Sequence, residues 1–146
     1  MSRDHRRLRV FNDAHALVLC IYKEANQFPR DEWFGMRMQM RRAALSVPAI
    51  IVEGCARSTT RDCCNFLNIA VGSASELAYL LEVANELRFI PPESGVELRA
   101  RAAAVVRQLK RLHSELEIRW RLEAGRSRDA RAPRPTPKTK DQRPAP

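Results

Sequence analysis

The sequence predicts an all-α fold, an antiparallel up-down-up-down four-helix bundle with a disordered basic C-terminal tail. Glycine is scarce, at five of 146 residues, whereas alanine, leucine, arginine and glutamate are plentiful, and this composition favours helix. Apolar residues recur at spacings of three and four in four long segments. Connections of only a few residues separate these segments, and short connections place successive helices antiparallel.

The limits of the helices follow from the residues that interrupt the apolar pattern. Pro29 ends the first segment, and Asp31 is placed to cap the second. Thr59 with Asp62 resembles a capping box before the third segment. The expected helices cover residues 10–28, 32–56, 60–88 and 93–123.

The second expected helix is apolar over most of its circumference, so neighbours should enclose it on several sides. A bundle of this size rarely encloses one helix so fully, and part of this surface is therefore expected to contact another subunit. Pro48 inside the helix predicts a kink, with Ser46 close enough to satisfy a freed backbone group. A narrow polar stripe interrupts the apolar surface and consists of Gln39, Arg42, Ser46, Glu53 and Arg57.

The third and fourth expected helices each present one apolar stripe to the core. In the third, small Gly72 and Ser73 would let another backbone approach closely. Its stripe consists of Phe66, Ile69, Ala70, Ser73, Leu77, Leu80, Leu81, Ala84 and Leu87. The heptad-like seam of the fourth consists of Leu98, Ala102, Val105, Leu109, Leu112 and Leu116.

The formal net charge of +9 lies mainly at the two ends of the chain. A basic N-terminal arm, residues 1–9, holds +3, and the tail, residues 124–146, holds +5, which leaves +1 for the bundle, residues 10–123. Mobile basic ends suit the phosphate backbone of a nucleic acid, and a solubilising tail is an equally good interpretation. The candidate nucleic-acid-binding residues are Arg3, Arg6, Arg7, Arg9, Arg126, Arg128, Arg131 and Arg134.

No motif predicts catalysis, a cofactor or a metal. The four cysteines form no C-x-x-C pair and are expected to be reduced and mostly buried. No histidine follows a glutamate by three residues, as a ferritin-like metal site requires, and His113 is interpreted as a partly covered side chain. No glycine-rich phosphate loop or Ser-His-Asp arrangement is present. The sequence therefore predicts a non-enzymatic protein.

The N-terminal residues are basic but lead into an amphipathic stretch rather than an apolar signal segment. No apolar run reaches the roughly 18 residues that span a bilayer. We therefore expect a cytoplasmic location and no membrane partner.

Two stretches place a proline, glycines and charged residues inside apolar helical patterns. The first, residues 41–58, contains Arg42, Ser46, Pro48, Glu53 and Gly54, and the second, residues 66–77, contains Gly72, Ser73 and Glu76. In this order they resemble the bacterial four-helix bundle family named after the 23S rRNA intervening-sequence protein. The resemblance extends over roughly residues 8–120. One departure is apolar Ile50, where the family usually has asparagine, so a role of that amide does not carry over.

The resemblance implies a homo-oligomer, because characterised members of this family are similar to ring-shaped homopentamers. The family is also similar to the accessory subunit of diversity-generating retroelements, a basic pentamer that binds a reverse transcriptase and nucleic acid. The implied partners are copies of the same chain, a nucleic acid such as RNA and, in the alternative, a reverse transcriptase. A bundle that binds RNA is the first hypothesis, and an accessory scaffold for another protein is the alternative.

The charged residues of the two stretches are expected to have structural roles. A carboxylate inside an apolar bundle should be paired, because burial of a lone charge costs several kcal/mol. We therefore expect Arg42 to bridge to Glu53 or Glu76 and to fix the register of the helices. The alternative interpretation is a pair of carboxylates that perform acid–base chemistry or hold two metal ions.

Overall fold

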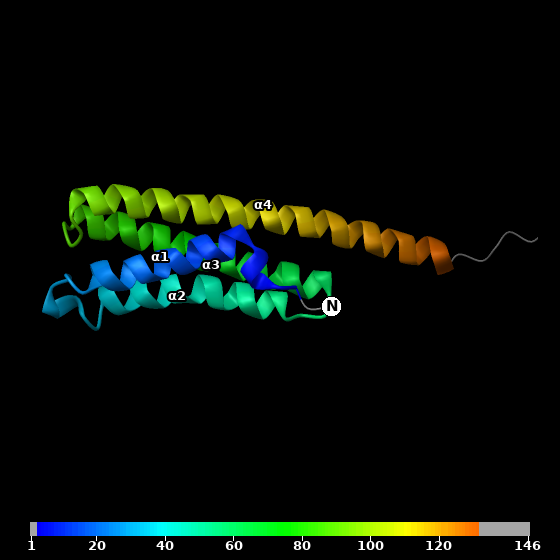
Figure 1. Ribbon diagram of the computed structural model, residues 1–146, viewed down its shortest axis with the longest axis horizontal. Helices are drawn as coiled ribbons and strands as arrows, with labels where there is room; N and C mark the ends of the chain where they lie inside the picture. Colours follow the sequence, from blue (N-terminus) through cyan, green and yellow to red (C-terminus); the bar gives the residue numbers. More distant parts are fainter. Residues whose placement is uncertain (1–2, 132–146) are drawn as a thin grey trace, which may run out of the picture.

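The structure is a computed structural model that describes residues 3–131. Four antiparallel α-helices form an up-down-up-down bundle (Figure 1), which confirms the predicted fold class. Helices α2 and α4 each pack against both α1 and α3, so the four helices form a closed ring around the core. In chain order the elements are η1 (His5–Arg7), α1 (Arg9–Ala25), η2 (Arg30–Glu32), α2 (Met36–Cys55), α3 (Thr60–Glu86) and α4 (Pro92–Arg131).

The core is apolar throughout: no polar or charged residue with a described side chain is buried. The predicted stripe of α4 lines this core, and so does a stripe of α1 formed by the apolar residues that recur at spacings of three and four in the segment 10–28. Tyr22, at the edge of the α1 stripe, is 38% exposed. Complete burial of such side chains contributes about 1.5–3 kcal/mol each. The largest fully buried side chains include Ile21, Met40, Ile51, Leu67, Leu77, Leu81 and Leu109.

The predicted stripe of α3 needs correction. Ile69 and Leu87 are 55% and 53% exposed, although both were expected in the core. Because α3 packs against both α2 and α4, these two neighbours determine which arc of the helix is buried. The buried residues of α3 are Cys63, Cys64, Leu67, Ala70, Ala74, Leu77, Leu81 and Ala84.

Helix α2 begins at Met36, four residues later than expected, and Asp31 does not cap it. Residues Arg30–Glu32 form the short 3-10 helix η2, and Gly35 occupies the N-cap position. The Glu32 carboxylate accepts a hydrogen bond from the Met36 amide at 3.1 Å, so a neighbouring acid replaces the expected cap. The cap of α3 is confirmed, since Thr59 accepts a hydrogen bond from the Asp62 amide at 3.1 Å.

Helix α2 continues through the buried Pro48 to Cys55. A proline deprives the carbonyl four residues earlier, here that of Ala44, of its amide partner. The Ser46 hydroxyl donates to the Ala43 carbonyl at 2.8 Å, so it does not satisfy the freed group. Ile50 is half-buried against the core, where an aliphatic side chain supplies packing instead of an amide's hydrogen bonds.

The close approach between α2 and α3 occurs at Gly54 rather than at Gly72. A Cβ atom added to Gly54 would lie 2.9 Å from the Cβ of Phe66, whereas one added to Gly72 would meet nothing within 4 Å. Gly72 is exposed, and Ser73 is half-buried beside the groove between α2 and α3. Close packing of α2 against α3 therefore requires a small residue at Gly54, and not at Gly72.

Helix α4 extends to Arg131, eight residues beyond its expected end at 123. The first proline after Pro92 is Pro133, so nothing before that point removes a backbone donor from the helix. Figure 1 shows that α4 projects past the other helices, at the end of the bundle where the N-terminus lies. The remainder of the expected tail, 132–146, lies outside the described residues.

By length and composition alone, α3 could span a membrane, because one of its 18-residue windows has a mean hydropathy of 1.2. Sequence analysis found no continuous apolar run of this length, since exposed polar residues such as Asn68, Glu76 and Glu82 interrupt it. Its buried face packs against α2 and α4, which is the position of a core helix.

Replacement of Gly54 by alanine should lower the free energy of unfolding by about 1–3 kcal/mol, because α2 and α3 must separate to admit the new methyl group. Gly125→Ala is the matched control, since its added Cβ meets nothing within 4 Å. Chemical denaturation followed by circular dichroism would compare the midpoints. A Gly54→Ala protein as stable as the control would contradict the close approach.

Candidate nucleic-acid interface

The described part of the N-terminal segment is folded onto the bundle. The Arg3 amide donates to the Cys55 carbonyl at 2.9 Å, and the Arg3 Nη2 donates to the Thr60 hydroxyl at 2.9 Å. The Asp4 carboxylate accepts from the Arg6 amide and caps η1. The prediction of a mobile arm is therefore wrong from Arg3 onward, because backbone and side-chain hydrogen bonds hold the segment at the connection between α2 and α3. Arg3 has a structural role there.

The other three arginines of this segment are exposed. The Arg7 Nε lies 3.8 Å from the Asp4 carboxylate, and the Arg9 Nε lies 3.7 Å from the Asp13 carboxylate. Exposed ion pairs of this kind are weak and exchange readily with water. Arg6, Arg7 and Arg9 can therefore turn toward an external anion.

The projecting part of α4 brings a second set of arginines to the same end of the bundle. Arg126 and Arg128 are exposed on it. Arg131 is the last residue of α4, but its side chain is not described, and Arg134 lies outside the described residues. Of the candidate arginines near the C-terminus, two thus have a defined position on the surface.

Two arginines beside the connection between α2 and α3 were not among the nucleic-acid-binding candidates: Arg57, which was assigned to the polar stripe, and Arg61. The exposed Arg57 lies over the Phe66 ring at 4.3 Å, and the exposed Arg61 lies over the Trp120 ring at 5.6 Å. The signal was present in the sequence, because both flank the polar Ser58–Thr60 turn that separates two helices. The Arg61–Trp120 contact also joins the start of α3 to the projecting part of α4.

These contacts bring three segments that are distant in sequence to one end of the bundle (Figure 1). We call this surface the basic end. Arginines at one end of the bundle produce a stronger local potential than the same charges dispersed over the chain, and Asp4 and Asp13 beside Arg7 and Arg9 reduce it in part. The basic end consists of Arg6, Arg7, Arg9, Arg57, Arg61, Arg126 and Arg128.

The expected bridge from Arg42 to Glu53 or Glu76 is not formed. All three side chains are exposed, and within residues 3–131 none of them forms an ion pair. The polar stripe of α2 faces outward, so the carboxylates remain hydrated and need no partner inside the chain. Arg42 and Glu76 instead line a groove of about 250 Å³ between α2 and α3, together with Ser46 and Ser73.

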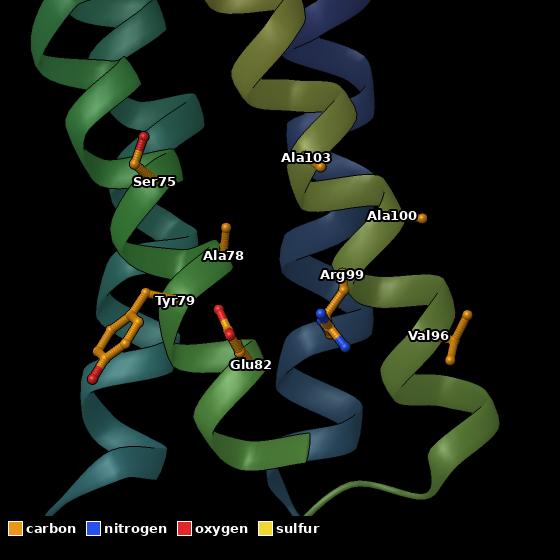
Figure 2. A pocket seen from close by; sticks show the side chains of 8 residues that line it. All are labelled: Ser75, Ala78, Tyr79, Glu82, Val96, Arg99, Ala100 and Ala103. Carbon is orange, nitrogen blue, oxygen red and sulfur yellow. The ribbon is translucent and has the colours of Figure 1, made fainter. Parts of the chain in front are cut away.

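A larger groove of about 640 Å³ lies between α3 and α4. Figure 2 shows Glu82 and Tyr79 on α3 and Arg99 on α4, with the Tyr79 ring pointing away from α4. Small side chains such as Ala78 and Ala103 form much of its wall. Its lining contains no histidine or cysteine, and Ser75 has no base beside it: its hydroxyl donates to the Val71 carbonyl at 2.8 Å. The groove thus lacks the nucleophile–base pair of acyl transfer.

Two of the three histidines contact aromatic rings. The His5 ring lies 4.6 Å from that of Phe11, and the His15 ring lies 6.1 Å from the same phenyl group. His113 is half-buried, in agreement with its interpretation as a partly covered side chain. The described residues contain no group of three histidine, cysteine or acidic side chains placed to hold a metal ion.

Burial raises the pKa of the Cys55, Cys63 and Cys64 thiols, and the neighbouring Cys63 adds to this effect for Cys55 and Cys64. Arg3 acts in the opposite direction, because its positive charge favours the thiolate. None of the four cysteines, all of which lie in the described part of the chain, forms a disulfide. The three buried thiols, Cys55, Cys63 and Cys64, are therefore protonated core residues rather than nucleophiles.

Alkylation of the native protein with iodoacetamide near pH 8 should modify the half-buried Cys20 first and the three buried cysteines slowly.

The raised pKa values of the buried thiols also predict how stability depends on pH. Above the pKa of an unfolded thiol, about 8.5, the folded state retains protons that the unfolded state has lost. Stability should therefore fall as the pH rises from about 8.5 through the raised pKa values. Mass spectrometry of alkylated peptides would check the first expectation, and denaturation at pH 7–10 the second. Equal labelling of all four cysteines would contradict the assigned burial.

Comparison with known proteins agrees with this architecture. The family model of the 23S rRNA-intervening sequence protein matches residues 6–111. A solved structure from Bacteroides thetaiotaomicron, described as a protein of unknown function from the S23 ribosomal protein family, is similar with a TM-score of 0.64 and 24% identity. That match covers 71% of this chain and 97% of the other, and no curated protein matches. The chain belongs to the family of the 23S rRNA-intervening sequence protein.

Proposed function

We propose that the protein is a non-enzymatic, homo-oligomeric bundle that binds RNA through its basic end. The observation that supports this proposal most directly is the convergence of arginines from the N-terminal segment, the α2–α3 connection and α4 at one end (Figure 1). A guanidinium group binds phosphate oxygens with a fork of N–H donors. The contacts would be mainly to phosphates, and binding would therefore depend little on base sequence.

The family favours RNA as the nucleic acid. Its name refers to 23S rRNA, and the similar solved structure is assigned to a ribosomal protein family. Residues 132–146 would add three positive charges to those at the basic end. An excess of positive charge speeds the approach of a polyanion and makes its binding dependent on salt.

Self-assembly is the second part of the proposal. Leu45 and Val52, seven residues apart on α2, and Ile69 on α3 are 50%, 36% and 55% exposed. A spacing of seven residues aligns side chains along a helix for packing against another helix. The unpaired Arg42 lines a groove with Leu45, and it lines the groove between α2 and α3 with the unpaired Glu76, so both charged residues could form ion pairs between copies. We name Leu45, Val52 and Ile69 the apolar patch, and propose a second copy as its occupant, with five copies in the ring that the family resemblance implies.

An accessory role for another protein, such as a reverse transcriptase, is the alternative. The same apolar patch would then contact that protein. A wild-type protein that forms a complex with a reverse transcriptase through Val52, and does not self-associate, would favour this alternative.

RNA binding should weaken with salt, with log K falling linearly against log salt concentration. The triple variant Arg6→Ala, Arg7→Ala, Arg9→Ala should bind a structured RNA hairpin about tenfold or more weakly at 50 mM salt, with a shallower slope, because phosphate contacts are lost. Fluorescence anisotropy with a labelled hairpin would measure both quantities.

The matched control removes three exposed arginines elsewhere, namely Arg88→Ala, Arg99→Ala and Arg107→Ala. It changes the net charge equally and should retain most of the affinity. A wild-type protein that does not bind the hairpin at 50 mM salt would rule out the proposal. Equal losses in the two triple variants would assign binding to net charge rather than to the basic end.

Val52→Glu should reduce the molar mass measured by light scattering after size-exclusion chromatography, because it places a charge in the apolar patch. Leu19→Glu is the matched control: Leu19 is 61% exposed on α1, so the same charge enters a different face. A wild-type protein that is monomeric at every concentration would exclude self-assembly.

A further inference from the structure

A second groove, of about 470 Å³, lies beside the connection between α1 and α2. Figure 1 shows this connection at the opposite end of the bundle from the N-terminus and the projecting part of α4. Its volume is within the range of small-ligand sites, about 300–1,000 Å³. Aromatic, apolar and arginine side chains line it, namely Tyr22, Trp33, Phe34, Arg37, Met38, Arg41, Arg42 and Leu45. The groove thus borders the proposed contact between copies at Arg42 and Leu45.

Three arginines line this groove, Arg37, Arg41 and Arg42, and none of them has a carboxylate partner within the described residues. The Arg37 Nη2 and the Arg41 Nη2 donate to the neutral Asn26 Oδ1 at 3.0 and 2.7 Å, and Arg41 also donates to the Tyr22 carbonyl at 3.3 Å. Neither arginine forms an ion pair with any residue that the structure describes, and no acidic residue lines the groove. The Nε atoms of both are buried without a hydrogen-bond acceptor. The groove therefore holds three positive charges that no carboxylate of the described residues compensates, and two of them, Arg37 and Arg41, share the Asn26 oxygen.

The aromatic side chains of the groove are held in place by the same arginines. Arg37 lies over the Trp33 ring at 4.8 Å, and Arg41 lies over the Tyr22 ring at 4.8 Å. The Trp33 Nε1 donates to the Phe28 carbonyl at 3.3 Å. Phe34 differs from these two residues, because its ring is 86% exposed. An exposed ring beside uncompensated cations combines a flat apolar surface with an anion-binding site.

We infer that this groove binds one unpaired nucleotide of single-stranded RNA, with its base stacked on Phe34 and its phosphate at Arg37 and Arg41. The inference rests on the proposed binding of RNA and adds a site to it. Stacking on an aromatic ring contacts any base, and guanidinium groups neutralise the adjoining phosphate. A nucleotide supplies the flat ring and the negative charge together, whereas an apolar segment of a protein would leave the cations uncompensated.

The test compares two labelled RNAs, a single-stranded oligoadenylate decamer and a fully paired hairpin without an unpaired extension. Loss of one base stack should weaken binding about tenfold, so Phe34→Ala should bind the decamer about tenfold more weakly and the hairpin as the wild type does. Phe34→Tyr retains a ring and should restore decamer binding. Tyr79→Ala is the matched control, because Tyr79 is an exposed aromatic residue, 64% exposed, beside a different groove.

A second readout uses the fluorescence of Trp33 in a Trp120→Phe background, so that only the groove contributes emission. Adenosine monophosphate should quench this emission, and Arg41→Ala should reduce the quenching, because the phosphate loses a cation. Circular dichroism would establish that each variant is folded.

The outcomes separate this inference from the proposed function. If the wild-type protein binds neither the decamer nor the hairpin, both the groove assignment and the proposed RNA-binding function are wrong. Binding of the decamer that is unchanged by Phe34→Ala, or Trp33 emission that neither the decamer nor adenosine monophosphate alters, overturns the groove assignment and leaves the basic end intact. A Phe34→Ala protein with a smaller assembly mass also overturns it, since a second copy would then occupy the groove.

Discussion

Burial of an unpaired charge costs several kcal/mol, and no charged residue with a described side chain is buried as a whole in the bundle. The residues that line the core are aliphatic side chains, alanines, one methionine, one phenylalanine and three cysteines, so charged residues must lie on the surface or beyond the helix ends. This constraint accounts for the outward position of Arg42 and Glu76. It also places arginines where the connections and the projecting part of α4 offer contact with water.

The sequence predicts elements well where the pattern of one helix decides the outcome. The stripes of α1 and α4 and the Thr59 cap follow from spacing and local hydrogen bonding, and the structure confirms them. The predictions were wrong where a neighbouring element determines which residues are buried or which residue caps a helix. Ile69 is exposed because α2 and α4 select a different arc of α3, and Asp31 lost its capping role to Gly35 and Glu32. Such contacts between elements leave no local signal in the sequence.

At the candidate interface, too, the sequence indicates the kinds of residue present but not the contacts between elements that place them. The distribution of charge along the sequence identified arginines near both termini of the chain. It could not show that the fold places them at the same end of the bundle as Arg57 and Arg61. Arg3 has the same charge as Arg6, yet its hydrogen bond to Thr60 gives it a structural role. The groove beside Phe34 depends on the turn at Gly35, which begins α2 later than the apolar pattern indicates.

The two proposed RNA contacts differ in chemistry and in position, and together they restrict the ligand. Helix α2, with 20 residues, is about 30 Å long, so the basic end and the groove lie roughly one bundle length apart. A paired helix presents phosphates to the basic end but keeps its bases stacked and unavailable to Phe34. A single unpaired nucleotide occupies the groove but offers only one phosphate to the arginines of the protein. A paired stem that continues into an unpaired strand supplies both, so a single chain could contact paired and unpaired parts of one RNA at once.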